Sequence, residues 1–199
     1  KLDRRFGDRE IMLPAVKSES RLDILVEAMG RVNYGEAIID RKGITKSVTL
    51  SESKKVINLK GWTIFNLHAD FETQLKPVYK TSTAKGPGWY KATFNLTETG
   101  TTYLDMSSWG KGLVWVNGHG MGRFWKIGPT QTLCVPGCWL KKGINEIIVF
   151  DVDYPAETTI AGLDHAILDK TAQDDALLHR KAGQQLKLGK VKAVAKGSL

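Results

Sequence analysis

The stretch from Trp109 to Phe150 constrains the fold more than any other part of this chain, because short apolar runs alternate there with residues that favour turns. Residues 113–116 (L-V-W-V) are aliphatic, β-branched or aromatic, which is typical of a strand. Side chains of a strand point alternately to its two faces, so Leu113 and Trp115 should share one face and Val114 and Val116 the other. Asn117-Gly118 tolerates the positive φ of a tight hairpin, and the pattern predicts a returning strand over residues 121–125.

Further segments continue this pattern toward the C-terminus. Gly128-Pro129 interrupts it, residues 130–135 resume the alternation, and a turn is expected between Pro136-Gly137 and Lys142-Gly143. A last strand is predicted over residues 145–152. Four strands at such close spacing are typical of a β-sandwich or a barrel and argue against a helical layer.

The literal sequence of this stretch resembles the β-galactosidases of glycoside hydrolase family 35. In that family a W-x-K-G-x-V-W-x-N-G-x-x-x-G-R-[FY]-W segment leads into G-P-x-x-T-L and a terminal N-x-I strand, and three segments here are similar to it: residues 109–125, 128–136 and 139–150. Further landmarks of the family have counterparts upstream in the same order, at residues 22–35, 40–45, 61–67 and 88–94. The resemblance covers about residues 20 to 153 and is far more specific than a lone glycine-rich motif.

The resemblance implies a fold and a domain order. Members of the family carry an N-terminal (β/α)8 barrel that performs the chemistry, followed by jelly-roll, galactose-binding-like β-domains. We therefore expect an all-β chain in which residues 54–155 form a galactose-binding-like jelly-roll β-sandwich. Residues 1–53 are expected to be the C-terminal strands of a preceding all-β domain plus a connection, and residues 156–199 a linker and basic tail or the start of a further β-module.

The expected strands of the first part include residues 11–13 and 22–26. They would lack their partner strands in this chain, and an unpaired apolar strand is an aggregation liability. We therefore predict that the first 50 residues are the less stable part of the molecule.

The sequence offers no credible catalytic site. Retaining glycoside hydrolysis needs two carboxyl groups about 5 Å apart, and the resemblance implies that both are glutamates of the barrel. The 199 residues present are fewer than the roughly 250 of a typical barrel. The carboxylates are interpreted as surface groups, the usual role of charged side chains. Glu36 and Asp40 fall in a predicted loop, and the others lie beside apolar strand positions: Asp23, Glu27, Asp105, Glu146, Asp151 and Asp153. We assign no catalytic residue and no cofactor, and expect the segment alone to be inactive.

Aromatic side chains are the best remaining candidates for a functional role. Five of the six tryptophans fall in the predicted sandwich, where an indole could stack on a sugar or pack in the core: Trp89, Trp109, Trp115, Trp125 and Trp139. Core packing or contact between domains is favoured, because large aromatics dominate β-sandwich cores. Arg123 could stack on such a ring or reach a carboxylate of the neighbouring barrel.

Two functions follow from these observations. The main hypothesis is that the chain is the non-catalytic β-sandwich portion of a retaining β-galactosidase that hydrolyses terminal β-galactosides, and that it supports the absent barrel. Its partners would then be the barrel and the preceding β-domain of the same polypeptide. The alternative is a stand-alone carbohydrate-binding module for galactosides, which would require two exposed, coplanar tryptophans beside a polar cluster.

The two cysteines, Cys134 and Cys138, do not form a metal site with the histidines, whose spacing supplies no further ligands. A free thiol buried at Cys134 is the favoured interpretation. A disulfide across the intervening Pro136-Gly137 turn stays an alternative, because such a turn can bring its flanks close but the geometry is exacting.

The formal charge of +8 and the isoelectric point of about 9.4 would by themselves suggest an acidic partner such as nucleic acid. Residues 179–199 contain six basic and no acidic residues, so the rest of the chain holds 23 basic against 21 acidic residues and is nearly neutral. No nucleic-acid motif accompanies the basic tail, and no apolar run approaches the ~18 residues of a membrane span. We therefore expect neither nucleic acid nor membrane insertion, although a basic-tailed binding protein unrelated to sugars is a weaker third hypothesis. The family resemblance favours a periplasmic or extracellular location and a bacterial origin.

Overall fold

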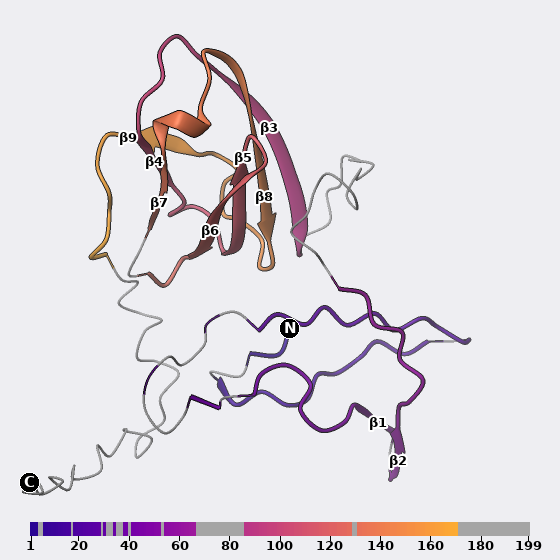
Figure 1. Cartoon of the computed structure of the whole chain (residues 1–199). Coiled ribbons are helices and arrows are strands. Elements are labelled where there is room, and N and C mark those ends of the chain that lie inside the picture. The colour runs from indigo at the N-terminus through magenta and orange to yellow at the C-terminus, as the bar shows by residue number, and fades with distance from the viewer. Residues whose placement is uncertain are drawn as a thin grey trace, which may run out of the picture.

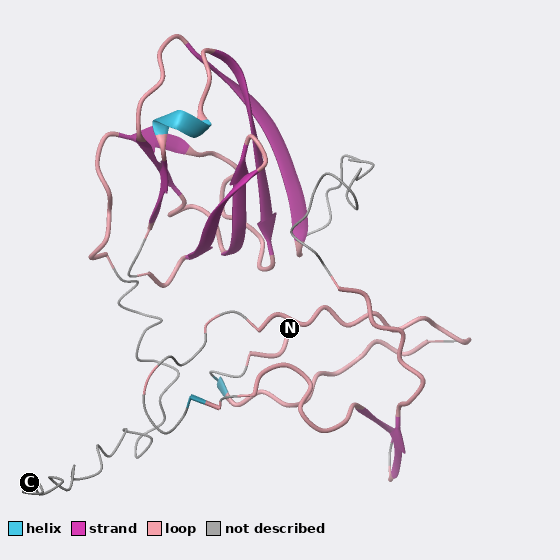
Figure 2. Ribbon diagram, viewed as in Figure 1, coloured by secondary structure: helices cyan, strands magenta, loops and turns pink. Residues whose placement is uncertain are grey.

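The computed structural model describes residues 1–3, 6–16, 18–28, 30, 34, 38–39, 41–52, 54–66, 86–128 and 131–170. Its strands, labelled in Figure 1, are β1 (Thr49–Glu52), β2 (Lys55–Asn58), β3 (Gly88–Leu96), β4 (Thr102–Asp105), β5 (Lys111–Val116), β6 (His119–Trp125), β7 (Thr132–Val135), β8 (Gly143–Asp151) and β9 (Ala161–Leu163). A short 3-10 helix, η3 (Gly137–Trp139), joins β7 to β8. Strands dominate the secondary structure in Figure 2, and the described residues contain no α-helix. The predicted all-β class is confirmed.

Seven of these strands form a β-sandwich. The larger sheet has the order β3-β8-β5-β6 and the smaller one the order β7-β4-β9. Neighbouring strands in both sheets are antiparallel, and the two sheets face each other in Figure 1. The sandwich predicted from the spacing of strands and turns is therefore present.

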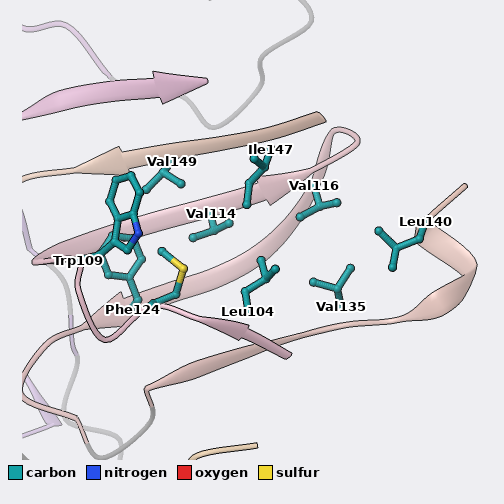
Figure 3. Close-up of a cluster of buried hydrophobic side chains, with 10 residues drawn as sticks. Leu104, Trp109, Val114, Val116, Phe124, Val135, Leu140, Ile147 and Val149 are labelled. Atoms are coloured by element: carbon teal, nitrogen blue, oxygen red, sulfur yellow. The ribbon is translucent and has the colours of Figure 1, made fainter. Parts of the chain in front are cut away.

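The core between the sheets is built on the alternation along β5 and β8. Val114 pairs with Val149 and Val116 with Ile147, and none of these four side chains is more than 8% exposed. Burying a side chain of this kind contributes about 1.5–3 kcal/mol. The buried cluster, most of which is drawn and labelled in Figure 3, comprises Leu104, Met106, Trp109, Val114, Val116, Phe124, Val135, Leu140, Ile147 and Val149.

The outer face of the larger sheet is aromatic. Trp115, which alternates with the inward valines of β5, is 5% exposed and lies 5.9 Å from Trp89 between ring centroids. Trp89 in turn stacks on Phe150 of β8 at 4.4 Å. The predicted division of residues 113–116 between two faces is confirmed, and both faces of β5 carry packed side chains.

The predicted hairpin is also confirmed. Asn117 and Gly118 have φ values of 48° and 82°, and two consecutive positive φ angles are what a two-residue hairpin turn requires. The returning strand β6 begins at His119, two residues before the predicted start. The pairing of β5 with β6 contains a bulge after Val114, which increases the local twist of the sheet.

Gly112 allows β5 to approach its neighbours closely. A Cβ atom on this residue would lie 1.7 Å from the carbonyl oxygen of Phe150 on β8 and 2.8 Å from the Phe124 ring. No side chain fits in that space, so the residue that begins the inward-facing series of β5 has to be glycine.

Two features of the sandwich were not predicted from the sequence. The turn expected between residues 136 and 143 contains η3, in which Trp139 N donates to Pro136 O. In addition, β9 pairs with β4, although residues 156–199 were expected to form a linker and tail or a further module. The segment after β9 also contacts the sandwich, because Gln131 N donates to Ile167 O. The predicted strand 130–135 corresponds to β7, with Thr130 outside the described residues.

The first part of the chain is different. Among its described residues, up to residue 66, the only strand pair is the hairpin β1–β2, whose eight residues are exposed. The strands predicted at residues 11–13 and 22–26 are wrong, because both segments are irregular. A strand is stabilised by hydrogen bonds to a neighbouring strand, and no described strand lies in register with either segment.

Candidate functional site

Glu27 is one of the carboxylates that were interpreted as surface groups, and the structure places it in a contact between the two parts of the chain. Its Oε2 pairs with Lys111 Nζ at the start of β5, and the two side chains are 25% and 15% exposed. The same ammonium group lies 4.2 Å from the centroid of the Trp125 ring. A second ion pair joins Lys1 to Asp153. These contacts hold the first part of the chain against the sandwich.

A hollow of about 280 Å³ lies beside this contact, lined by Glu27, Gly112, Leu113, Arg123, Phe150 and Val152. Arg123 is exposed on β6. Its predicted contact with a ring or with a carboxylate of the barrel stays a prediction. The hollow has the size to receive one bulky side chain rather than an oligosaccharide, since drug-sized ligands occupy about 300–1,000 Å³.

Asp151 was also grouped with surface carboxylates, and here the interpretation was wrong because Asp151 is fully buried. Backbone N–H groups take the place of water, which is how a buried charge is tolerated. Gly110 N donates to Oδ2 at 2.7 Å, and three backbone nitrogens donate to Oδ1: Lys111 at 3.4 Å, Asp153 at 2.7 Å and Tyr154 at 3.2 Å. The carboxylate therefore joins the turn before β5 to the chain after β8.

The burial of Asp151 could have been predicted from the sequence. Asn145, Ile147, Val149 and Asp151 alternate with Glu146 and Phe150, so they belong to one face of β8. Because that face is the core face, an aspartate in its series has to be buried. Burial, followed by the negative charges of Asp151 and Tyr154, raises the pKa of the neighbouring Tyr90 above its ordinary value.

A second polar cluster lies at the opposite end of β8. The Asn117 amide donates from Nδ2 to Trp139 O and to Asn145 Oδ1, both at 2.8 Å, and its Oδ1 accepts from Glu146 N at 2.9 Å. Asn145 is fully buried and its Nδ2 donates to Lys141 O at 2.7 Å. The two amides connect the β5–β6 turn, η3 and the start of β8, so the cluster has a structural role.

The tryptophans of the sandwich pack against other side chains and are not exposed on its surface. Trp109 is 3% exposed and donates from Nε1 to Thr159 O. Trp89 and Trp115 are tilted by 38° relative to each other, and Trp139 is covered on one side by the His119 ring at 4.7 Å. All six tryptophans lie in the described residues, and only Trp62, at 42%, belongs to the exposed large side chains. The predicted role in packing fits this geometry.

A groove of about 1440 Å³ runs along the side of the sandwich between β3 and β9. Apolar core residues form its floor, including Tyr90, Phe94, Trp109, Val149 and Ile160. Polar side chains also line the groove, namely Lys91, Thr93, Glu98, Thr101, Thr102 and Thr158.

Cys134 is exposed, so the prediction of a buried thiol is wrong. Leu133 and Val135 of β7 point to the core, and Cys134 therefore points outward. Cys134 and Cys138 are both free. The described residues contain no group of three or more His, Cys, Asp or Glu that could hold a metal ion, and no helix among them is long and apolar enough to cross a membrane.

Comparisons with known proteins give a consistent result along the chain. A family model described as "Beta-galactosidase, first all-beta domain" matches residues 2–68, and one described as "Beta-galactosidase, galactose-binding domain" matches residues 87–145. The chain is 37% identical over 166 residues to Beta-galactosidase-1-like protein 2 of Homo sapiens, an overlap of 79% of this chain and 24% of that protein. It is 35% identical over 184 residues to Beta-galactosidase 17 of Arabidopsis thaliana, with 81% and 26% covered. The chain thus spans about a quarter of the length of the curated relatives it matches.

Proposed function

Because this chain belongs to the β-galactosidases of glycoside hydrolase family 35 and carries two of their non-catalytic domains, we propose that it supports the catalytic (β/α)8 barrel of an enzyme that removes terminal β-linked galactose with retention of configuration. The observation that carries this proposal is the order of the two domain matches, first all-beta domain and then galactose-binding domain, along one chain. The chemistry then belongs to the remainder of the longer polypeptide.

The contacts between the two parts support a bracing role. The Glu27–Lys111 ion pair and the Lys1–Asp153 ion pair tie the first part to the rigid sandwich. Groups that position an active site work best when they rest on packed, rigid elements. Glu27 pairs with a lysine across the two parts, and Asp151 accepts from backbone N–H groups within the sandwich, so both carboxylates have a structural role.

The exposed apolar residues of the first part suggest that it is completed by other strands. Leu22, Ile24 and Val26 each expose 40% or more of their surface. Exposed apolar surface of this kind marks an interaction site. We infer that residues 1–53 belong to an all-β domain whose remaining strands come from the same polypeptide. The sandwich domain follows from residue 54 and extends past the predicted end at residue 155, because β9 pairs with β4.

The alternative, a galactoside-binding module that acts alone, has less support. It requires an exposed pair of coplanar tryptophans, whereas Trp89 and Trp115 are tilted and Trp115 is buried. The fold by itself does not establish sugar binding.

Hydrolysis of p-nitrophenyl β-galactoside by the purified 199-residue chain, combined with calorimetric titration of galactose and lactose, tests both functions. We expect neither turnover nor saturable heat. Turnover would contradict the non-catalytic assignment, and saturable heat without turnover would favour the binding module.

A further inference from the structure

Asn117-Gly118, the dipeptide at the turn between β5 and β6, is a reactive sequence. The backbone nitrogen of the residue after an asparagine can attack the side-chain Cγ, expel ammonia and close a succinimide ring. Water then opens the ring to aspartate or isoaspartate, so the net change is one water consumed and one ammonia released. Glycine at the second position favours the attack because it has no side chain in the way. The chain contains this dipeptide once.

The fold holds the reacting side chain away from that attack. Three hydrogen bonds occupy both polar atoms of the Asn117 amide, since Nδ2 donates to Trp139 O and Asn145 Oδ1 and the side-chain oxygen accepts from Glu146 N. The backbone of Asn117 is held as well, since its nitrogen donates to Glu146 O at 2.9 Å. Ring closure requires Cγ to move onto the Gly118 nitrogen, and the amide has to leave its partners to do so.

We propose that Asn117 is a site of spontaneous deamidation that folding masks and unfolding exposes. The reaction is one-way because ammonia is lost, and its product no longer fits the cluster. An aspartate at residue 117 lacks the N–H groups that now donate to Trp139 O and Asn145 Oδ1, and its charged oxygens face those two acceptors. Isoaspartate additionally lengthens the backbone within the two-residue turn. A chain modified while unfolded therefore returns to a less stable sandwich.

The test compares the modification rate at Asn117 in the native chain and in the same chain in denaturant, in mildly alkaline buffer, by peptide mass spectrometry. Three hydrogen bonds of ordinary strength predict a rate roughly a hundredfold lower in the native state. Asn58, which precedes leucine in the exposed strand β2, serves as the internal control and should react slowly in both states. Equal rates at Asn117 in the two states would overturn the proposal.

Two variants separate masking by the amide cluster from protection by the fold in general. Asn145→Ala removes one acceptor of the Asn117 amide and should raise the native rate at least several-fold. Gly118→Ala should lower the rate in denaturant, where no structure protects the site. If Asn145→Ala proves unstable, the wild-type rate is followed through the denaturant transition instead. A rate that rises with the unfolded fraction supports masking, and a rate independent of it contradicts the proposal.

Discussion

Residues 1–66 and residues 86–170 both alternate apolar with polar side chains, yet among the residues that the structure describes only those of the second region are buried. Val114, Val116 and Val135 of the sandwich are completely buried, whereas Met12 in the first region is 93% exposed and Val56 on β2 is 66% exposed. The two regions differ in the strands that are available to pack against. Each alternating strand of the sandwich finds a neighbour in its own sheet and a facing sheet, and the first region has one exposed hairpin in its described residues. Alternation therefore specifies which residues can be buried, and the surrounding strands decide whether they are.

The largest expected effect of this difference is on hydrogen exchange. Amides of β5 and β8 should exchange only on global unfolding, while those of the first 50 residues should exchange through local opening. Because global unfolding of a domain costs about 5–15 kcal/mol, protection should differ by a factor of roughly a thousand or more. Native-state exchange followed by mass spectrometry measures this directly. Equal protection of the amides from exchange in the two regions would contradict the claim that the first region is the less stable one.

Replacing Asp151 by alanine should be the most damaging single change in the sandwich. It leaves four backbone N–H groups without their acceptor, and an unsatisfied buried group costs about 1–3 kcal/mol. We expect a loss of at least about 3 kcal/mol, since more than one of these donors stays buried. Urea denaturation followed by tryptophan fluorescence gives the value. Asp105→Ala, which removes an exposed contact to Ser107 N, is the matched control, and a similar loss in both variants would refute the role of Asp151.

A pair of valine substitutions tests burial itself. Val116→Ala deletes two buried methyl groups and should destabilise the sandwich by about 2 kcal/mol, from about 0.8 kcal/mol per buried carbon plus a cavity contribution. Val56→Ala, on the exposed hairpin, should change stability by less than about 0.5 kcal/mol, as surface substitutions do. The urea denaturation midpoints of the two variants measure these two stability losses. A comparable loss at Val56 would show that the first region has a core of its own.

These expectations also show what the sequence could and could not predict. The hairpin from β5 to β6 was predicted because its signals, the apolar alternation and Asn117-Gly118, lie within a few residues of one another. The burial of Asp151 was missed although its place in the core-facing series of β8 indicates it. Its donors could not be predicted, because Gly110 and Tyr154 come from turns whose meeting depends on the tertiary fold. The three-residue β9 has no periodicity to detect and exists through its pairing with β4.

The strand prediction in the first region was wrong for a different reason. Residues 22–26 have a strand-like pattern, but the pattern predicts a strand only if a neighbour is present. The contact between Glu27 and Lys111 could not be predicted either, since 84 residues separate the two in sequence.

That contact should contribute modestly to the coupling of the two regions. A double-mutant cycle with Glu27→Gln and Lys111→Met should give an interaction energy of about 1 kcal/mol, at the upper end of the range for surface pairs because both side chains are largely covered. Methionine keeps the stem over the Trp125 ring. The same cycle on Arg21 and Asp23, which are more than 70% exposed, should give a value near zero. If the two cycles agree, the Glu27–Lys111 pair does not join the regions.

The smallest expected effect concerns alkaline pH and is confined to the sandwich. Burial and the nearby charge of Asp151 raise the pKa of Tyr90 in the folded state, so above the ordinary tyrosine pKa of about 10 the unfolded chain loses a proton that the folded chain retains. Stability is therefore unaffected by this group at lower pH and falls as the pH rises through the folded pKa. Tyr90→Phe should flatten that decline in urea midpoints measured between neutral and alkaline pH. Tyr34→Phe, in the exposed first region, should leave the decline unchanged, and an equal flattening by both variants would mean that the decline does not originate at Tyr90.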